Sequence, residues 1–469
     1  MSSNGNFIDP FEETIIRHPQ LSLRAHIIPL GLNVTRLIFD DPVESFEHDV
    51  IIGPESPQDH WRFGRKFLGP VVGRYANRLP VGKHKFDHDQ QTIDIEEYSA
   101  FSKSGVSLHG GPEEENRQLG QIPRNGFLVP QVGPFDRLVW QPLSSDQSQL
   151  FGPESASTAK GSSAIFGLLS KGVAPGGQQK GYPGDIRIEV RLAIVPGKEG
   201  NESISTSTTT PANLGKSAGT FHMEYRAKLV DGECTATPIN LTHHWAFNVS
   251  TSDAKARSQD KGTIENHTFR LIPPPMFDEQ RKPQLYAIGT CEKWIPTGTL
   301  LETENTPHDW SNEGKEGLGK TIIHKGGHEG YDQFYTWGAP EKKIVEKLNQ
   351  SEYEKALHAQ PRMILHAPSS QVTLTVRTNQ TGVQVYTANS QPPHPAVAEE
   401  SGGAKKKLHS NPGEEGLGNH QRSGIALEFS HPHGTFLHEK HQQFAQDDTV
   451  LRKGEQYRNW VELEVFKRV

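Results

Sequence analysis

The sequence predicts an all-β protein with few short helices. The 45 Gly and 33 Pro are spread along the 469 residues instead of clustering, which is typical of many short strands joined by turns. Several segments alternate apolar and polar residues with a period of two, the pattern of half-buried strands. The best helical signal is confined to residues 342–357, where Ile344 and Leu348 are four residues apart, as are Tyr353 and Leu357.

The N-terminal region predicts paired strands. Residues 21–28 and 34–39 are expected to be strands joined by a turn at Gly31 and Leu32. Residues 106–112 are expected to be a strand that ends in a glycine-rich loop.

The clearest strand is predicted at residues 185–195. Its apolar residues fall on one face and its charged residues on the other; the apolar set is Ile186, Ile188, Val190, Leu192 and Ile194. By the same alternation, residues 221–229 are its expected partner. Further strands are predicted at residues 372–376, 382–386, 423–429 and 460–466.

Three segments are expected to be surface insertions in one domain spanning residues 1–469. They lie near residues 145–180, 197–219 and 391–421, where the composition shifts to Ser, Gly, Gln, Lys, Thr or Pro. We expect them to be disordered surface loops. An alternative is that residues 395–420 lie over the site as a lid.

Charge and composition exclude several partners. The formal net charge of −7 argues against a nucleic-acid partner, which would favour a basic patch. No apolar run reaches the roughly 18 residues of a membrane span, and the two cysteines imply no disulfide framework. The first residues lack the charged and apolar regions of a secretory signal. We therefore expect a cytoplasmic protein, taken to be a monomer, without a membrane partner.

Glu428 is the first candidate for chemistry. It alternates with Ile425, Leu427 and Phe429, so its carboxylate points away from the apolar face of its strand. A carboxylate on a rigid strand, with histidines from elsewhere, suits acid–base catalysis. The alternative for a single strand glutamate is a solvated side chain on an exposed face.

Other polar residues could line the same site. His243 and His244 are adjacent on a predicted strand, so only one of them can face it. Asn77 and Arg78 offer an amide and a guanidinium fork, although a surface ion pair is the alternative for this dipeptide. The remaining candidates are His109 in a Leu-His-Gly-Gly loop, Asp332 in Gly-Tyr-Asp and Gln384 in Val-Gln-Val.

Motif searches exclude three enzyme classes and disfavour a metal centre. The chain has neither a His-Glu-x-x-His nor a Cys-x-x-Cys zinc spacing. It also lacks a Gly-x-Ser-x-Gly nucleophile motif, a phosphate-binding Gly-x-x-x-x-Gly-Lys-Ser/Thr loop and a dinucleotide-binding glycine fingerprint. We expect no metal and no cofactor.

Seven short motifs occur in one order along the chain. They are Phe-Leu-Gly-Pro-Val-Val-Gly-Arg-Tyr-Ala-Asn-Arg-Leu (67–79), Ser-Leu-His-Gly-Gly (107–111), Gly-Tyr-Pro-Gly (181–184), Asn-Leu-Thr-His-His-Trp-Ala-Phe-Asn (240–248), Gly-Tyr-Asp (330–332), Gly-Val-Gln-Val-Tyr-Thr-Ala-Asn (382–389) and Gly-Ile-Ala-Leu-Glu (424–428). Together they resemble the signatures of the aldose 1-epimerases, also called galactose mutarotases. The resemblance runs from about residue 21 to the C-terminus and skips the three insertions.

This resemblance implies a fold, an activity and residue roles. The fold would be a large antiparallel β-supersandwich, and the activity would be the interconversion of α and β anomers of free hexoses such as galactose or glucose. Glu428 would be the base and His244 the acid. The sugar hydroxyls would be bound by Asn77, Arg78, His109, Asp332 and Gln384.

The chain also departs from the family pattern near the acid. His243 stands where the family usually has Asn, and Trp245 where it has Ser or Thr, which leaves substrate choice open. One alternative is an epimerase of phosphorylated or oligomeric sugars, for which Arg74 and Arg78 are the candidate phosphate ligands. The other is a carbohydrate-binding or sugar-sensing protein without turnover.

Overall fold

The computed structural model describes most of the chain, and all structural statements below concern these residues. They are residues 7–41, 46–87, 90–97, 105–112, 119, 122–124, 127–152, 161–174, 179–197, 214–230, 232–274, 284–291, 293–310, 318, 330–338, 355 and 357–468. The predicted helix at 342–357 falls almost entirely outside this set.

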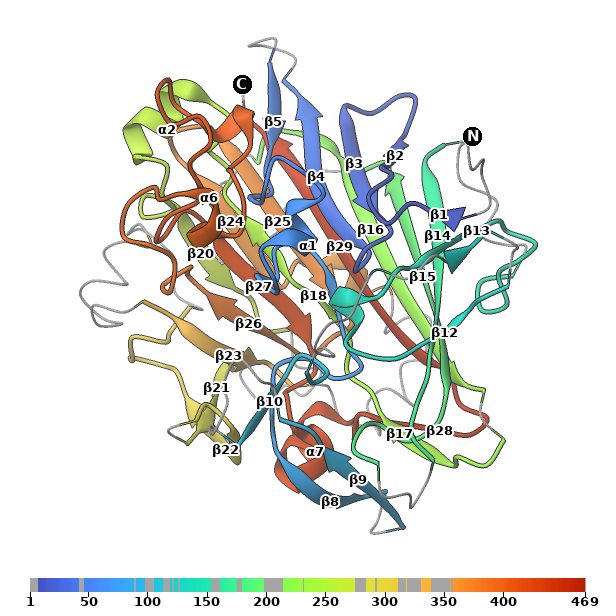
Figure 1. Cartoon of the computed structure of the whole chain (residues 1–469). Coiled ribbons are helices and arrows are strands. Elements are labelled where there is room, and N and C mark those ends of the chain that lie inside the picture. Colours follow the sequence, from blue (N-terminus) through green and yellow to red (C-terminus); the bar gives the residue numbers. More distant parts are fainter. Residues whose placement is uncertain are drawn as a thin grey trace.

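Two large sheets, mostly antiparallel, form the body of the molecule (Figure 1). The nine-stranded sheet has the order β12 (Pro130–Gln131), β14 (Ser163–Ser170), β15 (Ile186–Val195), β16 (Lys216–Leu229), β29 (Tyr457–Lys467), β25 (Val372–Thr378), β24 (Met363–Ala367) and β20 (Thr268–Leu271), with β13 (Gln141–Leu143) pairing with β14. The six-stranded sheet has the order β19 (Trp245–Phe247), β27 (Ile425–Ser430), β26 (Gly382–Tyr386), β23 (Asp332–Thr336), β21 (Tyr286–Thr290) and β22 (Pro296–Glu302).

Smaller sheets and short helices complete the structure. A four-stranded sheet contains β2 (Thr14–Arg17), β3 (Leu23–Ile28), β4 (Asn33–Asp40) and β5 (Glu47–Asp49). The two-stranded pairs are β1 (Phe7–Ile8) with β11 (Ile122–Pro123), β7 (Arg78–Pro80) with β10 (Val106–Leu108), β8 (Gly82–Phe86) with β9 (Gln91–Ile95), β17 (Ala236–Pro238) with β28 (Val450–Arg452), and β6 (Val71–Val72) with β18 (Thr242–His243). The helices are α1 (Asp59–Arg62), α2 (Ala254–Asp260), α6 (Ala398–Ser401) and α7 (Glu439–Ala445), with 3₁₀ turns η2 (Phe135–Arg137), η4 (Lys407–His409) and η5 (Thr435–Leu437).

The core lies where the nine-stranded sheet packs on the six-stranded and four-stranded sheets. It takes Leu192 and Met223 from the first, Val385 and Leu427 from the second, and Leu37 from the third. The five apolar residues predicted on one face of β15 are all 0% exposed. Burying a side chain of this size contributes roughly 1.5–3 kcal/mol, so period-two alternation accounts for the sandwich. The all-β prediction is confirmed.

The turn between β3 and β4 is where the sequence places it. Gly31 and Leu32 both adopt positive φ angles, 62° and 47°. A Cβ at residue 31 would lie 2.6 Å from the carbonyl oxygen of Asp136. Glycine is therefore required at this position both for the backbone conformation and for the close approach of η2.

Parts of the predicted insertions belong to the sheets, and the prediction is wrong there. Strand β14 lies inside 145–180 and pairs along its whole length with β15, and β16 begins inside 197–219. The sequence Ser-Ala-Ile-Phe-Gly-Leu-Leu-Ser of β14 is nearly continuous in apolar residues, because the strand is largely covered on both faces. Such a run lacks the alternation that identifies half-buried strands.

Residues 391–421 are also packed instead of disordered. Lys406 is 0% exposed, and its Nζ donates to the carbonyl oxygens of Thr35 (2.5 Å) and Ile51 (2.7 Å) and to Oδ2 of Asp49 (2.7 Å). Burial lowers the pKa of this amine to about 8, against the opposing attraction of Asp49. The segment is thus fixed to β4, to β5 and to the residues just after β5 by three hydrogen bonds of one buried ammonium group.

We expect Lys406→Met to lower the free energy of unfolding by about 3 kcal/mol, because it leaves the buried carboxylate of Asp49 without its closest cation. The guanidinium of Arg36 is still present, but its Nη1 lies 3.6 Å from Oδ2 of Asp49. Urea denaturation followed by fluorescence measures the change. Lys407→Met, at an exposed position of the same segment, is the matched control and should change stability by no more than about 0.5 kcal/mol. Equal stability of the two variants would contradict the anchoring role.

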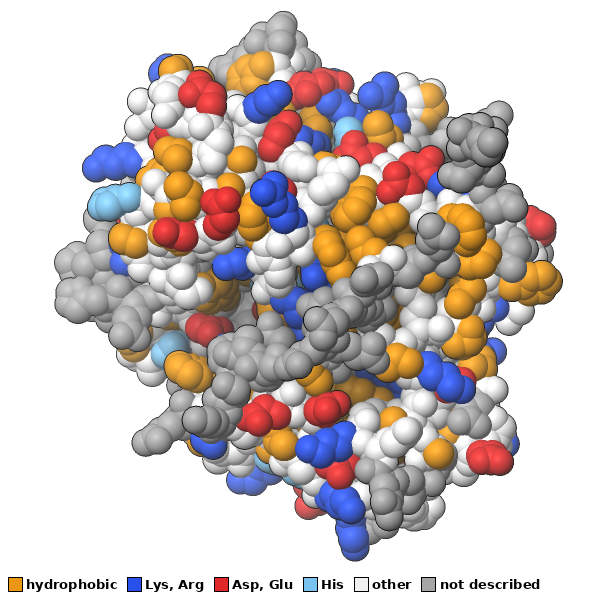
Figure 2. All heavy atoms as spheres, viewed as in Figure 1, with side chains coloured by type: hydrophobic (Ala, Val, Ile, Leu, Met, Phe, Trp, Pro, Cys, Tyr) orange, Lys and Arg blue, Asp and Glu red, His pale blue; other side chains and the backbone are white. Residues whose placement is uncertain are grey.

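The surface has mixed charge. Figure 2 shows Lys and Arg side chains interspersed with Asp and Glu on the visible face. None of the helices in the described part of the chain combines the length and the apolar character needed to cross a bilayer.

Candidate active site

Three of the predicted site residues form a row across the six-stranded sheet. Glu428 on β27 lies directly opposite Gln384 on β26, and Asp332 opens β23, the next strand. Val385 and Leu427, which alternate with them, point into the core. The row therefore lies on the face of the sheet away from the core, as the alternation predicted.

The pair β7 and β10 supplies three more of them. Arg78 is the first residue of β7, Asn77 directly precedes it, and His109 directly follows β10. The backbone N–H of Asn77 donates to Nδ1 of His109 (3.1 Å), and the N–H of His109 donates to the carbonyl oxygen of Asn77 (3.1 Å). Gly110 is required next, because a Cβ there would lie 1.9 Å from the carbonyl oxygen of Gly73. The Leu-His-Gly-Gly loop is thereby pressed against the 67–79 motif.

A chain of hydrogen bonds fixes four polar side chains. Nδ2 of Asn77 donates to Oε1 of Gln384 (2.9 Å), and Nε2 of Gln384 donates to Oδ1 of Asp332 (2.6 Å). Nη2 of Arg78 lies 3.2 Å from Oδ2 of the same carboxylate. The chain joins both motif groups into one preorganised set of donors and acceptors.

His244 and Glu428 form a close acid–base pair. Nε2 of His244 lies 3.1 Å from Oε1 of Glu428, and both side chains are largely buried. The main chain of His244 is held by hydrogen bonds to Pro70 and Gly69, both 2.9 Å. Burial alone lowers the pKa of His244, but the charge and hydrogen bond of Glu428 raise it overall above 6.5. Among the described residues, the buried Oε2 of Glu428 has no hydrogen-bond partner.

The other two histidines near this pair are kept neutral. Nδ1 of His109 lies 4.0 Å from Oε2 of Glu428, and burial, helped by the charge of His244, lowers its pKa well below 6.5. Because Nδ1 of His109 accepts from Asn77, Nε2 carries its proton. His243 points to the opposite side and packs against Trp245, with ring centroids 4.0 Å apart and the ring planes tilted by 32°. Burial lowers the pKa of His243 to about 3. The prediction that only one of the adjacent histidines faces the site is confirmed.

Arg65, Phe67 and Asp136 support the site from one side, although the sequence did not identify them as site residues. The ring of Phe67 lies 4.6 Å from that of His109 and 5.6 Å from that of His244, measured between centroids. Arg65 makes two 2.8 Å hydrogen bonds to the carboxylate of Asp136 and donates to the carbonyl oxygen of His109 (3.0 Å). Phe67 is the first residue of the 67–79 motif, so this motif could have identified it as a site residue. Arg65 and Asp136 are 71 residues apart, and nothing in the sequence links them.

Two imidazoles and one carboxylate are also ligands that zinc uses. The donor atoms of His109, His244 and Glu428 lie within 4.8 Å of one another. However, Nδ1 of His109 already accepts from Asn77, and Glu428 already pairs with His244. These hydrogen bonds favour proton transfer within the cluster over metal binding.

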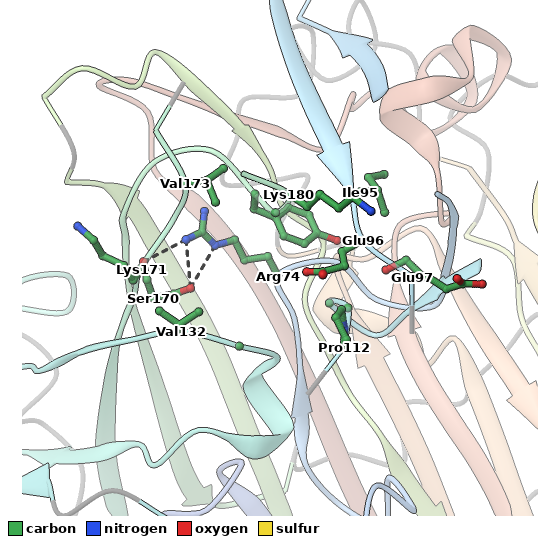
Figure 3. A pocket seen from close by; sticks show the side chains of 16 residues that line it. Arg74, Ile95, Glu96, Glu97, Pro112, Val132, Ser170, Lys171, Val173 and Lys180 are labelled. Atoms are coloured by element: carbon green, nitrogen blue, oxygen red, sulfur yellow. Dashed lines mark hydrogen bonds between the residues drawn. The ribbon is translucent and has the colours of Figure 1, made fainter. Parts of the chain in front are cut away.

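Arg74, a candidate phosphate ligand, is directed elsewhere. It lines another pocket, of about 420 Å³, to which none of the seven predicted site residues contributes. There its guanidinium donates to the carbonyl and hydroxyl oxygens of Ser170 (Figure 3). It also donates to the carbonyl oxygen of Gly184 (2.7 Å), and it is only 3% exposed. Arg74 is thus committed to joining the 67–79 and 181–184 motifs, which leaves Arg78 as the remaining candidate.

Comparisons with known proteins agree with this geometry. A model of the aldose 1-epimerase family matches residues 213–464. The galactose mutarotase of Homo sapiens is 24% identical over 367 residues, which cover 78% of this chain and 75% of that protein. Among solved structures, an aldose epimerase homologue from C. elegans has a TM-score of 0.60 at 16% identity, covering 98% of this chain and 99% of the other. A galactose 1-epimerase from Lactobacillus acidophilus has a TM-score of 0.57 at 14% identity, covering 98% and 100%.

Proposed function

The chain belongs to the aldose 1-epimerase family, and on that premise we propose that it interconverts the α and β anomers of free hexoses such as galactose and glucose. The observation that carries the proposal is the 3.1 Å pair of His244 and Glu428, beside a row of polar groups suited to sugar hydroxyls.

The pair has the properties that anomerisation needs. Glu428 takes the proton of the C1 hydroxyl at its unpaired Oε2, while protonated His244 gives a proton to the ring oxygen. The C1–O5 bond breaks, the C1–C2 bond rotates, and the ring closes on the other face. At closure, protonated Glu428 returns its proton to the C1 oxygen and neutral His244 takes one from the C5 hydroxyl. Both residues end in their starting protonation states.

The polar row holds the rest of the sugar during this rotation. Asn77, Gln384, Asp332 and Arg78 are fixed by one another, so they offer their remaining donors and acceptors without losing much side-chain entropy on binding. We propose that neutral His109 donates its Nε2 proton to a hydroxyl close to C1, because its ring lies next to Glu428.

The alternatives are less well supported. Phosphorylated sugars would favour several free basic groups, but Arg74 is buried and paired, and Arg78 already pairs with Asp332. A binding protein without turnover would not need a histidine whose pKa is held high by a buried carboxylate. The cytoplasmic location and monomeric state stay predictions from the sequence. The anomerisation rates of galactose and glucose decide between these two sugars.

The proposal predicts that the protein accelerates the anomerisation of freshly dissolved α-D-galactose or α-D-glucose. Polarimetry or proton NMR measures the rate, with and without a chelator. Acceleration that survives the chelator is expected, because acid–base catalysis by Glu428 and His244 needs no metal. Loss of rate in the chelator would instead assign a metal to the cluster of His109, His244 and Glu428, and no acceleration of either sugar would overturn the proposal.

A further inference from the structure

A buried ion pair lies next to the candidate active site. The side chains of Arg65 and Asp136 are only 2% and 3% exposed, and two hydrogen bonds of 2.8 Å join the guanidinium to both carboxylate oxygens. The desolvation of two charges offsets most of their attraction, so two apolar side chains of similar size often stabilise a fold equally well. Stability alone therefore does not explain an ion pair at this position.

Arg65 also holds the loop that carries His109. Nη1 of Arg65 donates to the carbonyl oxygen of Gly111 (2.7 Å), and Nη2 donates to that of His109 (3.0 Å). His109 and the two glycines after it all have positive φ angles, of 49°, 87° and 103°. This conformation is uncommon for histidine and persists where surrounding contacts impose it. Because Asn77 bonds to His109 from the β7 side, the loop is held between Asn77 and Arg65.

Asp136 connects this loop to a rigid part of the fold. It lies in η2, and the carbonyl oxygen of Leu138, directly after η2, accepts from the N–H of Gly31 (2.7 Å). Gly31 belongs to the turn between β3 and β4, so η2 is fixed to the four-stranded sheet. The carboxylate of Asp136 in turn fixes the direction of the Arg65 guanidinium, because a two-bond pair allows only one relative orientation.

The same guanidinium also acts on the imidazole of His109. Cζ of Arg65 lies 4.9 Å from the centroid of the Phe67 ring, and this centroid is 4.6 Å from that of the His109 ring. The pKa of His109 is lowered chiefly by burial and by the charge of His244, and the charge of Arg65 lowers it further. Packing and charge thus both favour a neutral His109 in one orientation.

We propose that the Arg65–Asp136 pair is a positioning device for His109, which aims the Nε2 donor of this imidazole at the bound sugar. This role rests on the proposed function, in which neutral His109 donates to a hydroxyl close to C1. Arg65 and Asp136 act through His109, so they are positioning residues and not catalytic ones.

Replacing both members of the pair by apolar residues tests this role. Arg65→Met combined with Asp136→Leu removes the contacts to the loop without leaving a buried charge unpaired. KM for galactose or glucose should rise by about three- to tenfold, the effect of one neutral hydrogen bond. We expect kcat to change by less than about twofold, because Glu428 and His244 are intact. Partial unfolding would instead lower kcat and leave KM unchanged.

Arg377→Met combined with Glu464→Leu is the matched control. This pair is also buried, with 2.8 Å between Nη1 of Arg377 and Oε2 of Glu464, but it joins β25 to β29 in the nine-stranded sheet. Its removal should leave both KM and kcat unchanged.

A double-mutant cycle with His109→Ala shows whether the pair acts through His109. In the His109→Ala background, removal of the pair should raise KM no further. An unchanged KM in the pair variant, or the same increase of KM in both backgrounds, would overturn the positioning role.

Nitrogen NMR of the imidazoles separates this role from the epimerase proposal, because it needs no turnover. In the wild-type protein, His109 should show a single Nε2–H tautomer, fixed by the hydrogen bond from Asn77. Signals of both tautomers are expected once Arg65 and Asp136 are replaced. If neither sugar is turned over but the His109 signals change in this way, the positioning of His109 stands and the epimerase proposal fails. Unchanged His109 signals would overturn the positioning role.

Discussion

Glu428→Gln is expected to lower kcat for anomerisation of galactose or glucose by about 10²–10⁴-fold. Glutamine has nearly the same shape and can still accept a hydrogen bond from His244, but it cannot take a proton from the C1 hydroxyl. Glu428 is on a central strand and only 4% exposed, so an isosteric change is required to keep the packing. Polarimetry gives kcat, and a thermal melt shows that the variant is folded.

Glu189→Gln is the matched control for this prediction. Glu189 is 0% exposed on β15, but its carboxylate is used structurally: it accepts from the hydroxyl of Ser148 (2.5 Å) and from the backbone N–H groups of Gln149 (3.0 Å) and Leu150 (3.1 Å). Its replacement should lower stability by about 1–3 kcal/mol with kcat unchanged. Near-normal turnover in Glu428→Gln would remove Glu428 from the proposed mechanism.

The sequence predicts the strands that bury one face in the core and carry polar residues on the other face. Alternation located β15 and β27 within a residue or two, because their polar residues point away from the packed face. It did not locate β14, whose apolar run is nearly continuous. The compact 391–421 segment was also missed, because its Gly, Pro and Lys content is that of a solvated loop. Only the folded chain brings three oxygen acceptors to Lys406.

The sequence predicted the site residues that belong to the seven motifs, because these motifs occur in one recognisable order along the chain. All seven predicted residues lie together, on strands and loops that come from distant parts of the chain. The Arg65–Asp136 pair could not be assigned in the same way. It forms through a contact across 71 residues, which leaves no local pattern in the sequence.

The pKa of His244 provides the second large effect. Because its pKa is raised above 6.5, we expect the imidazolium to serve as the acid near neutrality, and kcat/KM should fall as pH rises through this pKa. His244→Gln removes the acid and should lower kcat by about 10²–10⁴-fold while abolishing this pH dependence. The pair also stabilises the fold: its contribution is complete below pH 6.5 and is lost as pH rises through the folded-state pKa.

NMR titration of the imidazole resonances tests the cause of this shift. In Glu428→Gln the charge that raises the pKa is gone while burial remains, so the pKa of His244 should fall below 6.5. His243 is the internal reference, because burial lowers its pKa to about 3 and it should stay neutral in both proteins from pH 5 to 9. A His244 that titrates at the same pH with and without the carboxylate would mean that Glu428 does not hold its proton. The acid and the base would then have to be treated as independent groups, and the coupling between them would no longer explain why both are buried within 3.1 Å of each other.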